Sequence, residues 1–164
     1  SKHRSFAAIL LALLVIPAQA FAECNHIDAV YTDGGKYIMY VNKHKEPFTS
    51  TWYNLILENT ESGEKYDGAV VYGNGFSIPG VTFTIHCPTE GHEWYSPYMD
   101  EKEYCKKYGG TVYTIDGDAT RYGFSQDKPM LFPKLAFDLN YAWGVAYAFP
   151  RPNEVWNFKD CSNK

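Results

Sequence analysis

Alternation of apolar and polar residues recurs along most of the chain. Residues 81–86 alternate Val, Phe and Ile with Thr, and residues 111–115 continue the same style of pattern. A period of two is typical of a strand with one buried face. Residue types that favour strands also fill other stretches, namely residues 29–41, 51–58, 65–72, 135–149 and 154–158.

Turn-forming residues divide these stretches into hairpins. Asp33, Gly34 and Gly35 interrupt the first stretch, and residues 59–63 separate the second stretch from the third. Such residues between two strand-like runs indicate tight turns. We therefore predict a mainly β fold, a small antiparallel β-sandwich or open barrel.

One short helix is predicted, over about residues 97–108. Ser96 is a good N-cap and Pro97 suits the first helical position. Acidic residues follow in the first turn and lysines in the last, as the helix dipole favours. Gly109 is suited to the left-handed conformation that often follows a helix.

The first 22 residues have the pattern of a secretory signal peptide. Lys2 and Arg4 precede an uncharged apolar run at residues 6–16, and small residues follow at positions 18, 20 and 22. The run is shorter than the ~20 residues that a membrane-spanning helix needs. We expect cleavage before Glu23 and export by a bacterial secretory pathway to the periplasm or the medium.

Cleavage would change the charge of the working protein. The 164 residues carry a formal net charge of −4, from 15 basic and 19 acidic residues. Residues 1–22 hold two of the basic residues and none of the acidic ones, which leaves a net charge of −6 on residues 23–164. We expect these residues to form a single domain without a membrane anchor. An acidic balance argues against a nucleic-acid partner, because phosphates need a basic surface.

All four cysteines lie within residues 23–164. An even number of cysteines in an exported chain predicts disulfide bonds. Three pairings are possible, and we favour Cys24–Cys161, which joins the two ends, with Cys87–Cys105, which closes a short loop. A zinc site is the rival, but the cysteines are far apart and lack the close spacing of zinc ligands.

His86, Glu90, His92 and Glu93 are weak candidates for metal ligands. Imidazole and carboxylate groups suit divalent transition metals. However, a proline and a glycine within this segment indicate a loop, so no helix would hold the ligands in place. No metal is favoured, and no cofactor is predicted.

Two other patterns carry little chemistry. Asp116, Asp118 and Asp127 partly match the spacing of a calcium-binding loop, but Arg121 occupies the position of the required glycine, so we predict a β-turn. The sequence has no nucleophile motif of the G-x-S-x-G type, and two disulfides would leave no free thiol for catalysis. No catalytic residue is predicted.

Aromatic residues form 17% of the chain and provide the main functional indication. Exposed Tyr and Trp favour recognition of proteins or sugars. Acidic and aromatic residues combine in one segment, so its binding residues are predicted to be Glu90, Glu93, Trp94, Tyr95 and Tyr98.

The sequence therefore predicts an exported, non-catalytic protein-binding module, of the inhibitor or immunity type. Two alternatives remain open. The first is a carbohydrate or small-ligand binder that uses exposed Tyr and Trp, and the second, less favoured, is a metal-dependent enzyme.

Overall fold

The computed structural model describes most of the chain beyond the predicted signal peptide. The described residues are 24–43, 51–72, 78–87, 89–92, 95–100, 103–142, 145–146 and 151–162. The predictions for residues 1–22, and for Glu93 and Trp94, lie outside them.

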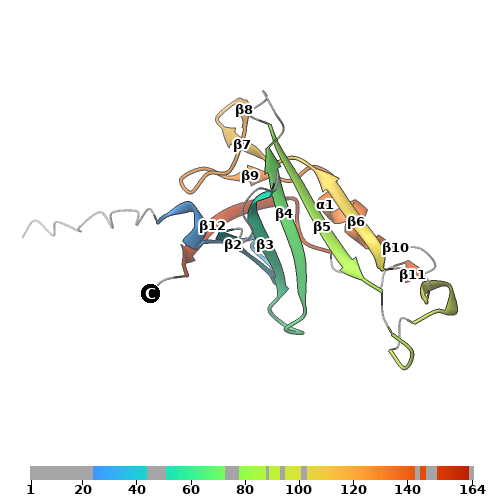
Figure 1. Ribbon diagram of the computed structural model, residues 1–164. Coiled ribbons are helices and arrows are strands. Elements are labelled where there is room, and N and C mark those ends of the chain that lie inside the picture. Colours follow the sequence, from blue (N-terminus) through green and yellow to red (C-terminus); the bar gives the residue numbers. More distant parts are fainter. Residues whose placement is uncertain are drawn as a thin grey trace, which may run out of the picture.

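Within these described residues, ten strands form one antiparallel sheet, in agreement with the predicted fold class (Figure 1). Their order across the sheet is β6-β5-β4-β3-β2-β1-β12-β9-β7-β8. The strands are β1 (Ala29–Thr32), β2 (Tyr37–Lys43), β3 (Thr51–Asn59), β4 (Lys65–Tyr72), β5 (Pro79–His86), β6 (Tyr104–Gly110), β7 (Tyr113–Asp116), β8 (Ala119–Tyr122), β9 (Met130–Leu131) and β12 (Val155–Cys161). The smaller elements are η1 (His26–Asp28), η2 (Pro97–Met99), α1 (Leu135–Asn140) and the pair β10 (Tyr141–Ala142) and β11 (Val145–Ala146).

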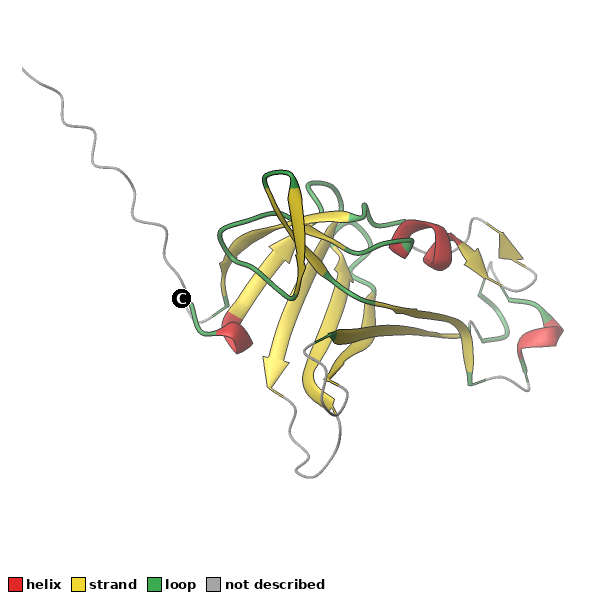
Figure 2. Ribbon diagram, turned by 90° about the horizontal axis from the view of Figure 1, so that it is seen from above, coloured by secondary structure: helices red, strands yellow, loops and turns green. Residues whose placement is uncertain are grey.

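A very short connection forces this sheet to curl. β6 is one edge of the sheet and β7 lies next to the opposite edge, yet only Thr111 and Val112 separate them in the chain. In a flat sheet these two strands would lie about 38 Å apart, at ~4.8 Å for each of eight steps. The link spans at most ~11 Å. The sheet therefore rolls into an open barrel, as Figure 2 shows, and β6 and β8 remain unpaired with each other.

The inner face of the rolled sheet holds the core. Along β5, Val81, Phe83 and Ile85 are buried, whereas the threonines between them are half-exposed. Aromatic rings meet edge to face or tilted across the interior: Phe132 lies 6.1 Å from Trp156 and 6.0 Å from Phe124, measured between ring centroids. The alternation in the sequence therefore separates the interior from the outer surface. Other fully buried side chains are Tyr31, Met39, Leu55, Leu57, Val70, Tyr108, Met130, Leu135 and Leu139.

The helix α1 covers the core beside β6. Leu135 and Leu139, four residues apart, share one helical face and are fully buried. Just before α1, the carbonyl of Pro133 accepts a 2.9 Å hydrogen bond from the Tyr108 hydroxyl on β6. The prediction of a strand through residues 135–149 is wrong for its first part, because burial on a helical face outweighs the apolar strand-like composition.

The predicted helix over residues 97–108 is also wrong. The helical turn that Ser96 and Pro97 indicate ends after three residues, in η2, and residues 104–110 form strand β6 instead. β6 pairs with β5 along its length, and the Tyr108 ring packs 6.3 Å from Phe83. Two effects override the local helix signals. β6 pairs with β5, and Gly109 and Gly110 disfavour a helix because glycine is a poor helix former.

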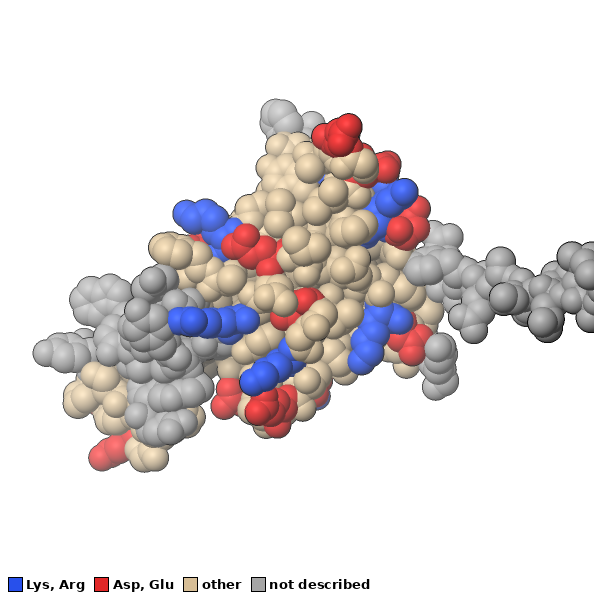
Figure 3. Space-filling model, turned by 180° about the vertical axis from the view of Figure 1, so that it is seen from behind, with Lys and Arg blue, Asp and Glu red and all other residues tan. Residues whose placement is uncertain are grey.

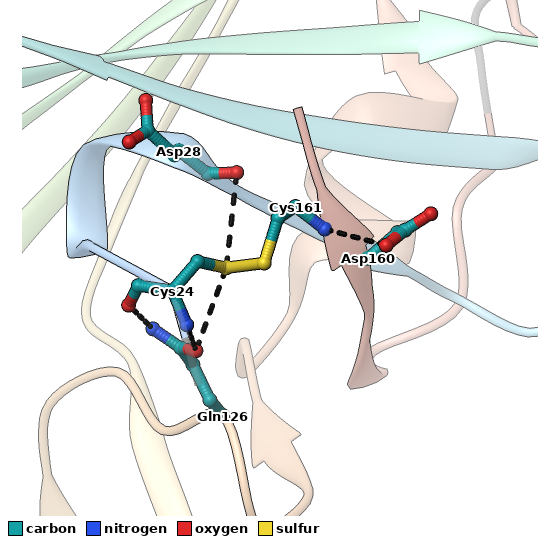
Figure 4. The surroundings of a disulfide bond; sticks show 5 residues. All are labelled: Cys24, Asp28, Gln126, Asp160 and Cys161. Atoms are coloured by element: carbon teal, nitrogen blue, oxygen red, sulfur yellow. Dashed lines mark hydrogen bonds between the residues drawn. A yellow bond between two sulfur atoms is a disulfide. The ribbon is translucent and has the colours of Figure 1, made fainter. Parts of the chain in front are cut away.

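Both predicted disulfides are present. Cys24 and Cys161 join the two ends of the described domain, with their Cα atoms 5.9 Å apart. Gln126 secures this end, because its side chain donates to the Cys24 carbonyl and accepts from the Cys24 backbone N–H (Figure 4). Cys87 and Cys105 link the end of β5 to the start of β6, with their Cα atoms 4.7 Å apart.

The predicted hairpins are confirmed, and the first depends on a buried carboxylate. Asp33 is 6% exposed, and its Oδ1 accepts hydrogen bonds from the backbone N–H groups of Gly35 and Tyr37 in the β1–β2 turn. Its Oδ2 accepts from the backbone N–H of Asn153, just before β12. One side chain therefore fixes a turn and ties it to a segment 120 residues away.

Gly68 on β4 provides a test of the core packing. A Cβ atom at this position would lie 2.5 Å from the Phe83 ring and 2.7 Å from the Thr82 carbonyl oxygen. We expect Gly68→Ala to lower the free energy of unfolding by about 1–3 kcal/mol, since the Phe83 ring must move. Urea unfolding with intact disulfides measures the change. Gly109→Ala, where no atom lies within 4 Å of the new Cβ, is the matched control; an equal loss in both variants would contradict the packing.

Candidate functional site

The candidate binding site is the loop between β5 and β6, called the acidic loop below (residues 88–103). It contains five acidic residues and one lysine, a formal net charge of −4: Glu90, Glu93, Asp100, Glu101 and Glu103 against Lys102. The disulfide Cys87–Cys105 closes its base. In Figures 1 and 2, η2 within this loop lies beyond the ends of β5 and β6, away from the rest of the sheet.

Internal contacts fold the described part of this loop onto itself. The Tyr95 hydroxyl lies 2.6 and 2.7 Å from the two carboxylate oxygens of Asp100. The backbone N–H of Tyr95 donates to the His92 carbonyl, and that of His92 donates to Thr89. Met99 is 3% exposed and anchors η2 to the core. These contacts give the described part of the loop a defined shape above its disulfide-closed base.

Electrostatic effects in the loop follow from these contacts. Donation to the Asp100 carboxylate is the largest cause that raises the pKa of Tyr95 to about 12. The nearby charge of Glu90 adds a smaller effect in the same direction. Tyr95 therefore stays neutral at physiological pH and acts as a hydrogen-bond donor within the loop.

The structure brings together only part of the predicted binding set. Glu90 is exposed and lies near the Tyr95 hydroxyl, which is already bonded to Asp100. Tyr98 belongs to η2, and Glu93 and Trp94 lie outside the described residues. The sequence reasoning missed Asp100, because the expected helix assigned it to a first turn. The five-residue spacing between Tyr95 and Asp100 gives no helical or strand-like signal of their contact.

The metal candidates are not gathered into a site in the described part of the chain. The His86 ring packs 4.8 Å from the Tyr104 ring, measured between centroids. No three His, Cys, Asp or Glu side chains among the described residues are placed to hold a metal ion together.

The aspartates with calcium-like spacing form the β7–β8 turn and its surroundings. Asp116 contacts the Lys128 ammonium group at 3.6 Å. Asp127 accepts a 2.7 Å hydrogen bond from the Ser125 hydroxyl, which is the largest cause of its lowered pKa. Gly117 has a φ of +59°, which suits the turn between the two strands. The predicted turn at this position is confirmed.

Among the described residues, the hydroxyls of Tyr31 and Thr111 are buried without a hydrogen-bond partner, and that of Tyr31 lies in the aromatic interior. Tyr31 is fully buried, and its hydroxyl has no hydrogen-bond partner among the described residues. Burial raises the pKa of this hydroxyl. Val41, Tyr53 and Phe124 surround Tyr31 and leave a gap too narrow for a water molecule. This gap offers no room for a ligand in the described conformation.

No helix in the described part of the chain is both long and apolar enough to cross a membrane.

Comparisons with known proteins add no function. No family model matches the chain, and neither the curated proteins nor the solved structures include a significant match to it. The functional argument therefore depends on the residues themselves.

The isolated hydroxyl of Tyr31 leads to a test of the interior. Tyr31→Phe removes a buried donor without a partner, so the free energy of unfolding is expected to stay the same or rise by about 1 kcal/mol. Tyr108→Phe is the matched control, because that hydroxyl donates to Pro133; its removal is expected to cost about 1 kcal/mol. Urea unfolding compares the two variants. A clear loss of stability in Tyr31→Phe would show that the hydroxyl has a partner.

Proposed function

We propose that this chain is an exported, non-catalytic protein-binding module, of the inhibitor or immunity type, that docks its acidic loop on a basic surface of a partner protein. The observation that carries this proposal is the disulfide-closed acidic loop beyond the end of the sheet. Exposed Glu90, Asp100 and Glu103 provide its described surface charge.

Preorganisation of the loop supports a binding role. A loop that is ordered before association loses less conformational entropy when it binds. Here the Cys87–Cys105 bond fixes the base, Met99 anchors η2 to the core, and the Tyr95–Asp100 contact closes the turn around η2. These contacts hold the described charged residues of the loop in a fixed arrangement.

The distribution of charge supports a basic partner. The loop carries a formal charge of −4, two thirds of the net charge of −6 on residues 23–164. On the face seen from behind, by contrast, acidic and basic side chains are interspersed (Figure 3). A concentrated field of one sign speeds association with a partner of opposite sign and weakens as salt is added.

Two disulfides support export, since such bonds persist in oxidising compartments and are rare in the cytosol. Export also agrees with the signal-peptide pattern of residues 1–22. An inhibitor or immunity protein would meet its target in the same compartment.

Charge reversal tests the role of the acidic loop. With immobilised protein and extracellular or periplasmic extract, the unmodified chain is expected to retain basic proteins that 0.5 M salt releases. The double variant Glu90→Lys, Glu103→Lys is expected to retain at least tenfold less of them, because it reverses the field of the loop. Quantitative mass spectrometry of the eluates provides the measurement.

The matched control is Glu61→Lys, Asp118→Lys, which also reverses two exposed carboxylates, in the β3–β4 and β7–β8 turns. The 2.6 Å contact of Glu61 with Lys36 is exposed on both sides, so its loss costs little stability. Retention by this control should equal that of the unmodified chain. Equal retention by the loop variant, or retention that salt does not change, would contradict the proposal.

Export is tested by processing in a bacterium. With an initiating methionine added, the chain is expected to be recovered from the periplasm or medium with Glu23 as its first residue, as N-terminal sequencing would show. Leu11→Asp interrupts the apolar run at residues 6–16, and this variant is expected to remain in the cell as an uncleaved precursor. Recovery of the unmodified chain with residues 1–22 attached would contradict the assigned boundary.

A further inference from the structure

An apolar row crosses the outer face of the sheet at the end formed by β12, β9, β7 and β8. Strand register places Val155 opposite Leu131, Leu131 opposite Tyr113, and Tyr113 opposite Tyr122. Directly opposed residues share a face, so these four side chains form a line about 14 Å long, at ~4.8 Å for each strand. Val155 is 43% exposed and Tyr122 is 48% exposed, whereas the inward-facing row beside it contains the buried Trp156 and Met130.

The row ends at a strand with an unpaired edge. β8 is the last strand in the sheet order, and no described strand pairs with its far side. All four of its residues are exposed. The Tyr113 and Tyr122 rings lie 4.9 Å apart, so the apolar surface continues up to this edge.

The hydrogen-bond pattern shows which backbone groups of β8 are unpaired. The Ile115 N–H donates to the Pro129 carbonyl, so odd-numbered residues of β7 bond toward β9. Even-numbered residues of β7 therefore bond toward β8, where Thr114 opposes Arg121 and Asp116 opposes Ala119. The N–H and C=O groups of Thr120 and Tyr122 consequently point away from the sheet.

From this geometry we propose that β8 is a strand-addition site, where an extended segment of a partner polypeptide pairs with Thr120 and Tyr122. Main-chain hydrogen bonds would provide affinity, and alternate side chains of the segment would provide specificity. On the outer face, an apolar side chain of the segment extends the row beside Tyr122. On the other face, a carboxylate of the segment meets the exposed Arg121.

Charge complementarity favours such a segment over a second copy of this chain. If two copies of this chain paired antiparallel through β8, the outward-pointing Thr120 or Tyr122 of one copy would have to lie opposite Asp118, Thr120 or Tyr122 of the other copy. Pairing Thr120 with Tyr122 places Arg121 opposite Arg121 of the second copy, which is repulsive. The two-fold pairing centred on Thr120 opposes Tyr122 with Asp118 and interrupts the apolar row. The pairing centred on Tyr122 places Thr120 beyond the end of the other copy's β8, which ends at Tyr122 before Gly123 turns away with a φ of +122°, so it joins a single pair of residues. A foreign strand that alternates apolar and acidic residues avoids these conflicts.

This site lies on the β7–β8 hairpin, which is at another end of the molecule from the acidic loop (Figure 1). It is independent of the proposed function. The variant Glu90→Lys, Glu103→Lys should bind the peptide below unchanged, so failure of one proposal leaves the other standing.

The test uses the full disulfide-bonded chain and a capped synthetic hexapeptide of alternating valine and glutamate. Backbone NMR during titration is expected to show new protection from hydrogen exchange at the Thr120 and Tyr122 amides. A hexapeptide of alternating valine and lysine is the matched probe, and its affinity is expected to be at least fivefold lower. In Arg121→Glu this preference should reverse, because the charge that selects the peptide is reversed.

Thr120→Pro provides the decisive variant. Proline removes the outward N–H of residue 120, which the β7–β8 pair does not use, so the hairpin is retained while strand addition is blocked. Peptide affinity should fall at least tenfold, whereas Thr120→Val, which keeps the N–H, should bind as the unmodified chain does. The Tyr113 and Thr114 amide signals verify that the hairpin is intact in both variants.

Three results would overturn the proposal. One is the absence of protection at Thr120 and Tyr122 with the glutamate peptide. Another is undiminished peptide affinity in Thr120→Pro with an intact hairpin. The third is protection of the same amides that grows with protein concentration alone, because this would identify a second copy as the occupant.

Discussion

The fold depends on the two-residue connection between β6 and β7. Because Thr111 and Val112 must join strands that lie eight positions apart in the sheet, the sheet cannot be flat. Rolling creates an interior, and that interior has to be filled. Large aromatic rings, among them Trp156 and Phe132, and the helix α1 beside β6 fill it. The 17% aromatic content of the chain is therefore partly a packing requirement.

The same geometry separates the buried residues from exposed residues that are candidates for binding. The inner face of the rolled sheet holds the buried side chains, whereas two segments of the described chain extend from the sheet and carry exposed residues. One is the acidic loop, whose base is closed by Cys87–Cys105, and the other is the β7–β8 hairpin. Since Glu90, Glu103 and the four residues of β8 are exposed, they can change without disturbing the packing of the core.

Sequence reasoning succeeded where local patterns and tertiary contacts agree. Turn residues such as Gly34 lie in the turns of the predicted hairpins, and the four cysteines form the two disulfides that we favoured. It failed where the contacts override the local signals. Residues 97–108 have helix-like caps before and after them, yet residues 104–110 form a strand that completes the sheet beside β5, and Leu135 begins a helix within a strand-like run. The Tyr95–Asp100 contact in the acidic loop was not predicted, since a spacing of five residues matches neither helical nor strand periodicity.

The Cys24–Cys161 bond has a consequence for what happens when a protease cuts the chain. β1 and β12 are neighbours in the sheet, and the disulfide joins the outer ends of this pair. All ten described strands of the sheet lie within the covalent ring that results, which runs from residue 24 to residue 161 and so contains 138 residues. A single cut by a protease in any exposed turn opens this ring without releasing a fragment. The nicked molecule keeps every described strand covalently attached, so a single cut does not separate the strands of the sheet.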